Sequence, residues 1–389
     1  MRVNLALQNI RHSLPRTIVS LAGIGIAITL IFVQLGFRGA VENTALMIYE
    51  KMDFDLVVRS RDYLHFIDSG NIPQTALDAA RSVNGVQSAV PFHVTLVNWR
   101  NPLNSDLRGM VLMGVEPALP TFNSLEVSRD LEKLTSFSQV LVDSESSPEF
   151  GPADGHEFSV ADIGVQTELA GQKVRIAGLY RMGAGLTANG SAIISVDGYN
   201  RLVPWDSVQR PAMGLIKVEP GFNLNEVAAQ IIQLNSDAQH QPLVEVLTRQ
   251  QVLNREINRW IGETPIGFVF TLGVGTAFIV GAAIFYMVLS NDVATRLKEY
   301  ATLRAMGYRN SWLAAVVLKQ AIWLALFAFV PSVIVSIAFY EITSILANLP
   351  IFMTTSRLVF VFMLTQLMCM ISGTLALRKL WSAEPASLF

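Results

Sequence analysis

The dipeptide His156–Glu157 is the part of the sequence that comes nearest to a metal-dependent hydrolase motif. In zinc proteases the motif H-E-x-x-H places two histidines one helical turn apart, so that both bind the same Zn²⁺ ion. Position 160 is Val160 here, so the second zinc ligand is missing. The sequence therefore does not predict a zinc protease.

Other motifs of catalysis and nucleotide binding are also missing. The sequence has no G-x-S-x-G elbow of a serine hydrolase and no Walker A motif for ATP. The glycine-rich stretch Met182–Ser191 (MGAGLTANGS) lacks the GK[ST] ending of a phosphate loop, and we interpret it as a surface loop. The acidic stretch Asp143–Glu145 lacks the spacing of a calcium-binding EF-hand. We predict that this chain is not an enzyme and holds no metal or nucleotide cofactor of its own.

The composition is typical of a membrane protein. Of the 389 residues, 51% are hydrophobic and 15% are charged, whereas a soluble domain is about one quarter charged. The mean hydropathy is +0.40. The net charge of −2 gives no sign of a nucleic-acid partner. The single cysteine, Cys369, lies in an apolar run and cannot form a disulfide within the chain.

Four uncharged apolar runs are each long enough for a helix across a bilayer, which takes about 20 residues. They lie at Thr17–Phe37, Thr264–Asn291, Gln320–Tyr340 and Leu358–Leu377. Because the backbone in hydrocarbon must satisfy its own hydrogen bonds, we predict four membrane helices, at 17–37, 264–291, 313–340 and 358–377. The first run is longer than the apolar core of a signal peptide and no A-x-A site follows it, so we expect an uncleaved anchor.

Lysine and arginine residues in the short segments predict the orientation, because they accumulate on the cytoplasmic side. Such residues are Arg2, Arg11 and Arg16, then Arg296, Lys298, Arg304, Arg309 and Lys319, then Arg378 and Lys379. The short loop 341–357 carries only Arg357. We therefore place the N-terminal amphipathic segment 1–16, the segment 292–312 and the tail 378–389 in the cytoplasm. The long segment 38–263 then lies in the periplasm, outside the inner membrane of a bacterium.

The long outer segment has the pattern of an α+β domain. Strand-like Asp53–Ser60 is followed by a helical pattern at Thr75–Val83 and by strand-like runs up to Val115. A similar unit recurs later, with a strand at Leu215–Val218, a helix at Asn225–Leu234 and a strand at Leu243–Leu247. We predict a porter-like split βαβ subdomain (53–117 and 211–247), a β-rich inserted subdomain (118–210), and two stalk helices (38–52 and 248–263).

The charged stretch Asp292–Ser311 (DVATRLKEYATLRAMGYRNS) interrupts the apolar C-terminal half. As a helix it would place Val293, Leu297, Tyr300 and Ala301 on one face, with Gly307 ending the helix and Ser311 capping the next. Periodicity leaves two interpretations open. The segment is either a connecting loop whose basic residues meet anionic lipid, or a rigid knob that inserts into a groove of a cytoplasmic partner.

A resemblance favours the second interpretation. Glu299–Leu313 (EYATLRAMGYRNSWL) is similar to the coupling segment of the FtsX/MacB-like permeases of ABC transporters. Together with Thr264–Asp292 (TPIGFVFTLGVGTAFIVGAAIFYMVLSND), it resembles the DevC-type permeases more narrowly. The terminal motifs NLALQNIRHSLPRT and RKLWSAEPASLF also resemble those of the family. The family layout, four membrane helices with a large outer domain between the first two, corresponds to the whole chain.

This resemblance implies a mechanotransmission-type permease that works as a homodimer. Separate DevA-like ATPase subunits would bind ATP and Mg²⁺, and a DevB-like periplasmic adaptor and a TolC-like outer-membrane channel would complete a tripartite exporter of a hydrophobic or amphiphilic substrate. Two related alternatives remain: a lipoprotein-releasing permease, and an FtsX-like signalling permease that controls a cell-wall hydrolase. A membrane receptor unrelated to ABC proteins would leave the coupling motif unexplained.

The resemblance also implies which residues contact the ATPase. We expect an apolar contact from Leu297, Tyr300, Leu303 and Met306. We expect a polar rim from Arg296, Glu299 and Arg304, and a sharp turn back to the membrane at Gly307.

Overall fold

The computed structural model describes residues 14–183, 189–204, 210–236, 241–347 and 349–381. Its contacts divide the chain into two compact units. The helical unit comprises Met1–Ala40 and Ile261–Phe389, and the α+β unit comprises Val41–Trp260. Most of the N-terminal amphipathic segment, most of both terminal motifs and the middle of the glycine-rich stretch lie outside the described residues.

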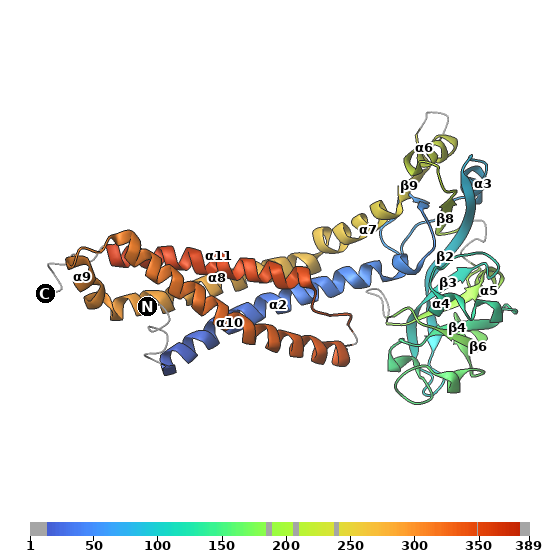
Figure 1. Ribbon diagram of the computed structural model, residues 1–389. Helices are drawn as coiled ribbons and strands as arrows, with labels where there is room; N and C mark the ends of the chain where they lie inside the picture. The colour runs from blue at the N-terminus through green and yellow to red at the C-terminus, as the bar shows by residue number, and fades with distance from the viewer. Residues whose placement is uncertain (1–13, 184–188, 205–209, 237–240, 348, 382–389) are drawn as a thin grey trace. The chain divides into compact units, whose positions relative to one another are not determined.

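The helical unit consists of long helices that lie side by side, with one short helix at one end of the bundle (Figure 1). The helices are α2 (Leu14–Lys51), α8 (Pro265–Thr295), α9 (Leu297–Ala305), α10 (Asn310–Ala347) and α11 (Thr355–Trp381). Within the described residues, 4 helices are long and apolar enough to cross a membrane: α2, α8, α10 and α11. The chain is therefore a multi-pass membrane protein with the fold class that the apolar runs predicted.

Hydroxyl groups and small residues hold the membrane helices together. The Ser332 hydroxyl on α10 donates to the Gly25 carbonyl on α2 at 3.1 Å, and Ser372 on α11 donates to the Ala282 carbonyl on α8 at 2.7 Å. Gly281 allows a close approach of α8 and α11, because a Cβ there would lie 2.8 Å from the sulfur of Met368. Close approach through small residues and interhelical hydrogen bonds is how helices associate in lipid, where the hydrophobic effect between them is absent.

The two stalks join the membrane helices in different ways. The first membrane helix and the first stalk helix are one continuous helix, α2, in agreement with the stalk expected at 38–52. The second stalk is interrupted: α7 (Arg249–Ile257) is followed by the π-helix Asn258–Glu263, and Thr264 has an extended backbone before α8 begins. Pro265 explains this break, because a proline at the first helical position cannot continue a preceding hydrogen-bond ladder.

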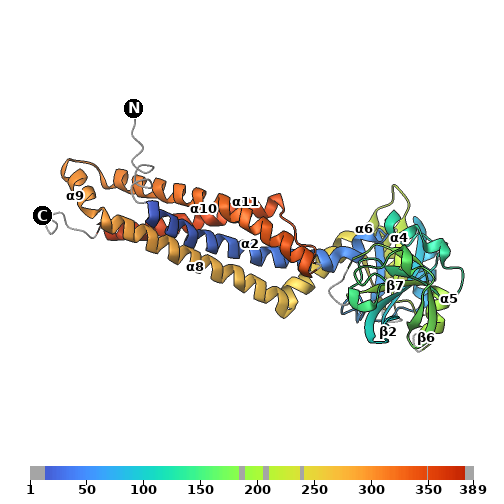
Figure 2. The same ribbon diagram turned by 90° about the horizontal axis from the view of Figure 1, so that it is seen from below.

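The α+β unit is built on one continuous sheet with the strand order β3-β7-β4-β6-β5-β2-β8-β1-β9. The strands are β1 (Leu56–Ser60), β2 (Val86–Arg100), β3 (Leu107–Val115), β4 (Gln139–Asp143), β5 (Gln166–Leu169), β6 (Gln172–Tyr180), β7 (Ser191–Ser195), β8 (Met213–Val218) and β9 (Val244–Thr248). The short helices are α3 (Gln74–Arg81), α4 (Leu125–Ser128), α5 (Val196–Leu202) and α6 (Leu224–Leu234). Viewed from below, β2, β6, β7 and α5 gather in one part of this unit (Figure 2).

One half of the sheet has the split βαβ topology that the sequence predicts. Its order β2-β8-β1-β9, with α3 after β1 and α6 after β8, is that of a ferredoxin-like domain. Side chains alternate between two cores: Leu56 and Val58 face α3 and α6, whereas Val57 faces the opposite side with Tyr49. This period of two is the reason that the strands were visible in the sequence.

The boundary of the inserted subdomain differs from the expected one. The sequence predicts Met110–Val115 in the porter-like half, but β3 pairs with β7 and with the distal part of β2, so it belongs to the second half of the sheet. The second half of the sheet therefore begins within β2, between the residues that pair with β8 and those that pair with β3, and not at residue 118. The pairing of β3 with β7 joins residues about 80 positions apart, and no local pattern indicates such a partner.

Candidate functional site at the α8–α10 connection

The backbone between α8 and α10 folds into a compact helix–turn unit. α8 ends at Thr295, and Arg296 (φ −100°, ψ 12°) leaves helical geometry before α9 begins. At the other end, the Tyr308 N–H bonds the Leu303 carbonyl at 3.2 Å and the Gly307 N–H bonds the Arg304 carbonyl at 3.0 Å. These two bonds, with Gly307 at φ +93°, form a Schellman turn, which confirms Gly307 as the residue that ends the helix.

Asp292 fixes the start of this connection. Its carboxylate accepts a hydrogen bond from the Gln320 side chain on α10 and forms an ion pair with Arg296 at 3.4 Å. Arg296 also approaches Glu299 at 3.8 Å, and its side chain is mostly buried. Arg296 therefore spans the break between α8 and α9, and only part of it is accessible to a partner.

The buried face of α9 packs against the ends of three long helices. Tyr300, 5% exposed, forms a cluster with Val293 of α8, Leu313 of α10 and Leu377 of α11, and Leu297 and Leu303 are half-buried against it. The Tyr300 hydroxyl has no hydrogen-bond partner among the described residues. Burial, and then the nearby Asp292 carboxylate, raises the pKa of Tyr300 to about 12.

This packing corrects one expectation from the sequence. Tyr300 cannot provide a surface contact, because its ring fills the cluster that holds α9 to the bundle. Leu297 and Leu303 are turned toward the same cluster, and only part of each is accessible. Of the four residues expected to form an apolar contact, Met306 alone is well exposed, at 69%. The predicted shared face of Val293, Leu297, Tyr300 and Ala301 is confirmed, but it points into the protein.

The exposed apolar surface of the connection lies at its turn. Met306, Tyr308 and Trp312, which we call the exposed patch, follow one another around Gly307. The rings of Tyr308 and Trp312 are 4.6 Å apart between centroids. Methionine and aromatic residues are enriched where protein interfaces form, so this patch suits a protein partner. The sequence signal of this patch is two aromatic residues four positions apart after a glycine, and of its three residues only Met306 is among the expected contact residues.

The polar residues of the connection differ in exposure. Glu299 is exposed and Arg304 is half-buried, so both reach the surface as expected of a polar rim. Ser311 does not cap α10, because α10 begins one residue earlier, at Asn310, and the first helical N–H groups bond the Arg309 carbonyl. Helix ends are often displaced by a residue from their sequence signal.

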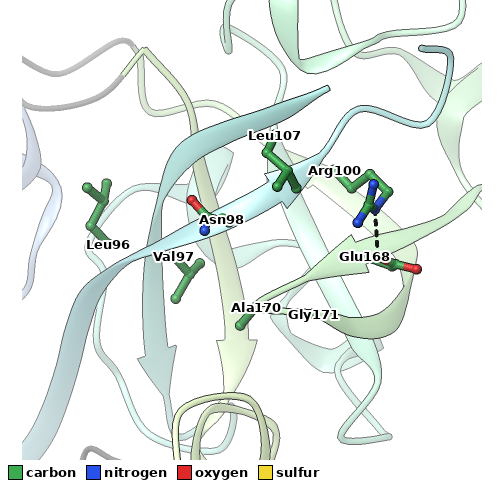
Figure 3. A pocket seen from close by; sticks show the side chains of 8 residues that line it. All are labelled: Leu96, Val97, Asn98, Arg100, Leu107, Glu168, Ala170 and Gly171. Carbon is green, nitrogen blue, oxygen red and sulfur yellow. Dashed lines mark hydrogen bonds and ion pairs between the residues drawn. The ribbon is translucent and has the colours of Figure 1, made fainter. Parts of the chain in front are cut away.

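A pocket of about 420 Å³ is a second candidate, in the distal half of the sheet. Figure 3 shows Arg100 and Glu168 facing each other at its edge, where they form an ion pair of 2.6 Å, with Leu107 near Arg100. Val97, Asn98 and the β5–β6 turn also line the pocket. The two charged residues that line it neutralise each other, so the pocket has no free acid–base group. No cluster of three or more metal-binding side chains occurs among the described residues either.

Two family models match this chain. The model of the MacB-like periplasmic core domain matches residues 17–234, and the model of the FtsX-like permease C-terminal region matches residues 271–385. The chain belongs to the MacB/FtsX-like family of ABC transporter permeases. The connection with α9 and the exposed patch lies inside the matched FtsX-like region of this permease.

Three solved structures similar to parts of this permease are the following. The extracellular domain of the noncanonic ABC-type transporter YknZ from Gram-positive bacteria is 13% identical, with a TM-score of 0.35, over 50% of this chain and 99% of that chain. The periplasmic region of MacB from Actinobacillus actinomycetemcomitans is 8% identical, with a TM-score of 0.36, over 53% of this chain and 93% of that chain. A domain of a putative permease protein from Porphyromonas gingivalis is 13% identical, with a TM-score of 0.30, over 51% of this chain and 88% of that chain. A comparison with curated proteins gave no match. The family assignment rests on the two family models.

Proposed function

We propose that this permease is the transmembrane subunit of a tripartite ABC exporter. A separate ATPase would bind the α8–α10 connection, and the energy of ATP hydrolysis would move the α+β unit in the periplasm. One observation supports this proposal above the others. The connection is a firmly packed unit whose exposed patch, Met306, Tyr308 and Trp312, is left uncovered by the described part of the chain.

The packing of α9 suits it to transmit force. The cluster of Tyr300, Val293, Leu313 and Leu377 joins α9 to α8, α10 and α11. The contacts of Asp292 with Arg296 and Gln320 hold the backbone fixed at the break between α8 and α9. A partner that moves the patch would therefore move the ends of three membrane helices together, since packed interiors transmit strain and do not yield locally. The expected polar contacts of Arg296, Glu299 and Arg304, and the turn at Gly307, stay part of this proposal.

The family and the charge pattern support the remaining components of the proposal. The basic residues of the connection favour a cytoplasmic position for it and for both termini, and the α+β unit would then lie in the periplasm, outside the inner membrane. Two copies of the permease would pair with two ATPase subunits, which would hold ATP and Mg²⁺. An adaptor and an outer-membrane channel would receive a hydrophobic or amphiphilic substrate.

Substitutions in the exposed patch test the ATPase contact. We expect Met306→Asp and Trp312→Asp to abolish co-purification of the ATPase, because a charge in a buried interface is costly, while the thermal unfolding of the permease stays unchanged. Leu125→Asp is the matched control, since Leu125 is 83% exposed in the α+β unit. Retention of the ATPase by both patch variants would contradict the proposed contact.

Purification from native membranes tests the tripartite assembly. Affinity-tagged permease should retain an ATPase with a Walker A motif and an adaptor with a long helical hairpin, and cargo should stimulate ATP hydrolysis. An ATPase without any adaptor would favour a lipoprotein-releasing permease instead. Stimulation by a cell-wall hydrolase alone would favour the signalling alternative and would count against export.

A further inference from the structure

Within the α+β unit, the outer end of α2 and the start of α7 continue into two neighbouring strands. α2 ends at Lys51, shortly before β1, and α7 starts directly after β9. β1 and β9 are antiparallel partners, with Leu56 opposite Thr248, and the Arg249 N–H bonds the Asp55 carbonyl at 3.0 Å. The Thr248 hydroxyl and the Gln251 side chain form a capping box that starts α7 at this point.

Arg249 joins the two helix ends directly. Its guanidinium donates to the carbonyls of Glu50 at 2.9 Å and Met52 at 2.8 Å, so the first residue of α7 caps the end of α2. The last carbonyls of a helix lack partners within the helix and carry a partial negative charge, which a cation at this place satisfies.

A buried polar cluster makes a second link between the same helices. The Tyr49 hydroxyl on α2 lies 2.6 Å from the Tyr63 hydroxyl, which donates to the Glu256 carboxylate on α7 at 2.7 Å. Arg59 on β1 lies 3.5 Å from the same carboxylate and 4.0 Å from the centre of the Tyr63 ring. Glu256 is only 2% exposed. We call Tyr49, Arg59, Tyr63, Glu245 and Glu256 the Glu256 cluster.

Glu245 on β9 completes the cluster. It accepts from the Nε of Arg59 at 2.9 Å and from Arg255 on α7. Buried charges are costly unless each has its partner, so removal of one member leaves the others uncompensated. The contacts of the cluster therefore form or break together, and they connect α2, β1, β9 and α7 in one body.

We propose that Glu256 is a positioning residue that makes the outer ends of α2 and α7 move as one body with the β1–β9 strand pair. The inference rests on the proposed function, because it concerns the step in which movement of the membrane helices reaches the periplasmic domain. Without this link, either helix could move relative to the sheet at the point where they meet, and the sheet itself would not move. With it, both helices act on the same edge of the sheet, where β9 is the outermost strand and β1 is its neighbour.

Hydrogen exchange of the purified full chain tests the link without any ATPase. Glu256→Gln keeps the size of the side chain and its contact with Tyr63 but removes the charge that Arg59 meets. We expect faster backbone exchange in α7 and also in residues 41–51 of α2, which do not contain the substitution. The matched control, Glu226→Gln on the exposed side of α6, should leave both segments unchanged. Faster exchange confined to α7 would overturn the proposal, because it would show a local role only.

Coupling in the assembled complex is the second measurement. We expect Glu256→Gln to lower the amount of substrate exported per ATP hydrolysed, while ATPase binding and the ATPase rate stay unchanged. Tyr63→Phe removes the hydroxyl between Tyr49 and Glu256. It should also lower export per ATP without changing ATPase binding or the ATPase rate, and it replaces Glu256→Gln in the test if that variant does not fold. Unchanged export per ATP in both variants would overturn the proposal. If no ATPase binds the wild-type chain, the proposed function fails, whereas the exchange measurement still decides the link.

Discussion

The backbones of Gly267 and Ile261 are in direct contact at the start of α8. A Cβ built on Gly267 would lie 2.0 Å from the Ile261 carbonyl oxygen and 2.4 Å from its Cα. No side chain fits this space, so the contact between the π-helix and the first turn of α8 requires glycine. The close approach lies beside the break at Thr264, where the backbone is extended between the π-helix and Pro265.

Gly267→Ala should therefore destabilise the helical unit. The neighbour in contact is backbone and cannot rotate away, so we expect a loss of about 1 to 3 kcal/mol, as for overpacking of a rigid site. Thermal unfolding of the detergent-purified chain measures the effect. Gly275→Ala is the matched control on the same helix, because a Cβ at Gly275 meets nothing within 4 Å. Equal unfolding of the two variants would show that the contact at Gly267 is not tight.

Glu256 should make stability depend on pH in a defined direction. Burial raises the pKa of Glu256 above its usual value of 4.5, against the opposing effects of Tyr63, Arg59 and Arg259. A carboxyl with a raised pKa favours its protonated form in the folded state, so its ionisation lowers stability as pH rises above about 4.5. Glu256→Gln removes this contribution, so the unfolding free energy of the variant relative to wild type should increase with pH from about 4.5 upward.

The control for this measurement is Glu116→Gln, which replaces an exposed carboxylate of the same unit. The unfolding free energy of Glu116→Gln relative to wild type should not show the increase with pH that we expect for Glu256→Gln. Chemical unfolding of the full chain at a series of pH values gives both differences. A relative stability of Glu256→Gln that falls with rising pH would mean that Arg59 holds the carboxylate ionised and that burial is not the larger effect.

Gly307→Val should disturb the Schellman turn and, with it, the exposed patch. A β-branched residue at φ +93° is strained by about 1 to 2 kcal/mol or more, and the turn can relax by moving Tyr308. Gly221→Val carries the same strain at φ +99° in the α+β unit, with open space around it. We expect similar losses of thermal stability in both variants but loss of ATPase co-purification only in Gly307→Val. If Gly221→Val loses the ATPase as well, the effect is one of general stability.

Local signals predicted most of the secondary structure. The four apolar runs are long and free of charge, so hydrophobicity alone identifies them, and the period-two strands around Val57 and Leu215 identify the split βαβ half. Gly307 was predictable because a Schellman turn needs a residue that tolerates positive φ. The break at Thr264 also had a local signal, the sequence Thr-Pro followed by Gly267, but the apolar run continued across it and concealed the break.

What could not be predicted depends on partners far apart in the sequence. The assignment of β3 to the distal sheet is decided by its pairing with β7. The apolar face of α9 points into the protein because Leu313 of α10 and Leu377 of α11 pack against Tyr300. An amphipathic pattern shows that a helix has an apolar face, but it does not show whether that face contacts the same chain or a partner. The Glu256 cluster is likewise assembled from four elements, and its residues show no common motif.

Tyr300→Phe separates the two possible roles of Tyr300. The hydroxyl is buried without a hydrogen-bond partner in the described structure, which costs about 1 to 3 kcal/mol, and burial raises the pKa of Tyr300 to about 12, so the group stays neutral at physiological pH. Removing it should leave the unfolding free energy unchanged or slightly higher and should not affect ATPase binding. Tyr308→Phe, on the exposed patch, is the comparison. Loss of the ATPase from Tyr300→Phe at unchanged stability would mean that this residue reaches the partner, as the family resemblance implies, and that α9 turns outward when the complex forms.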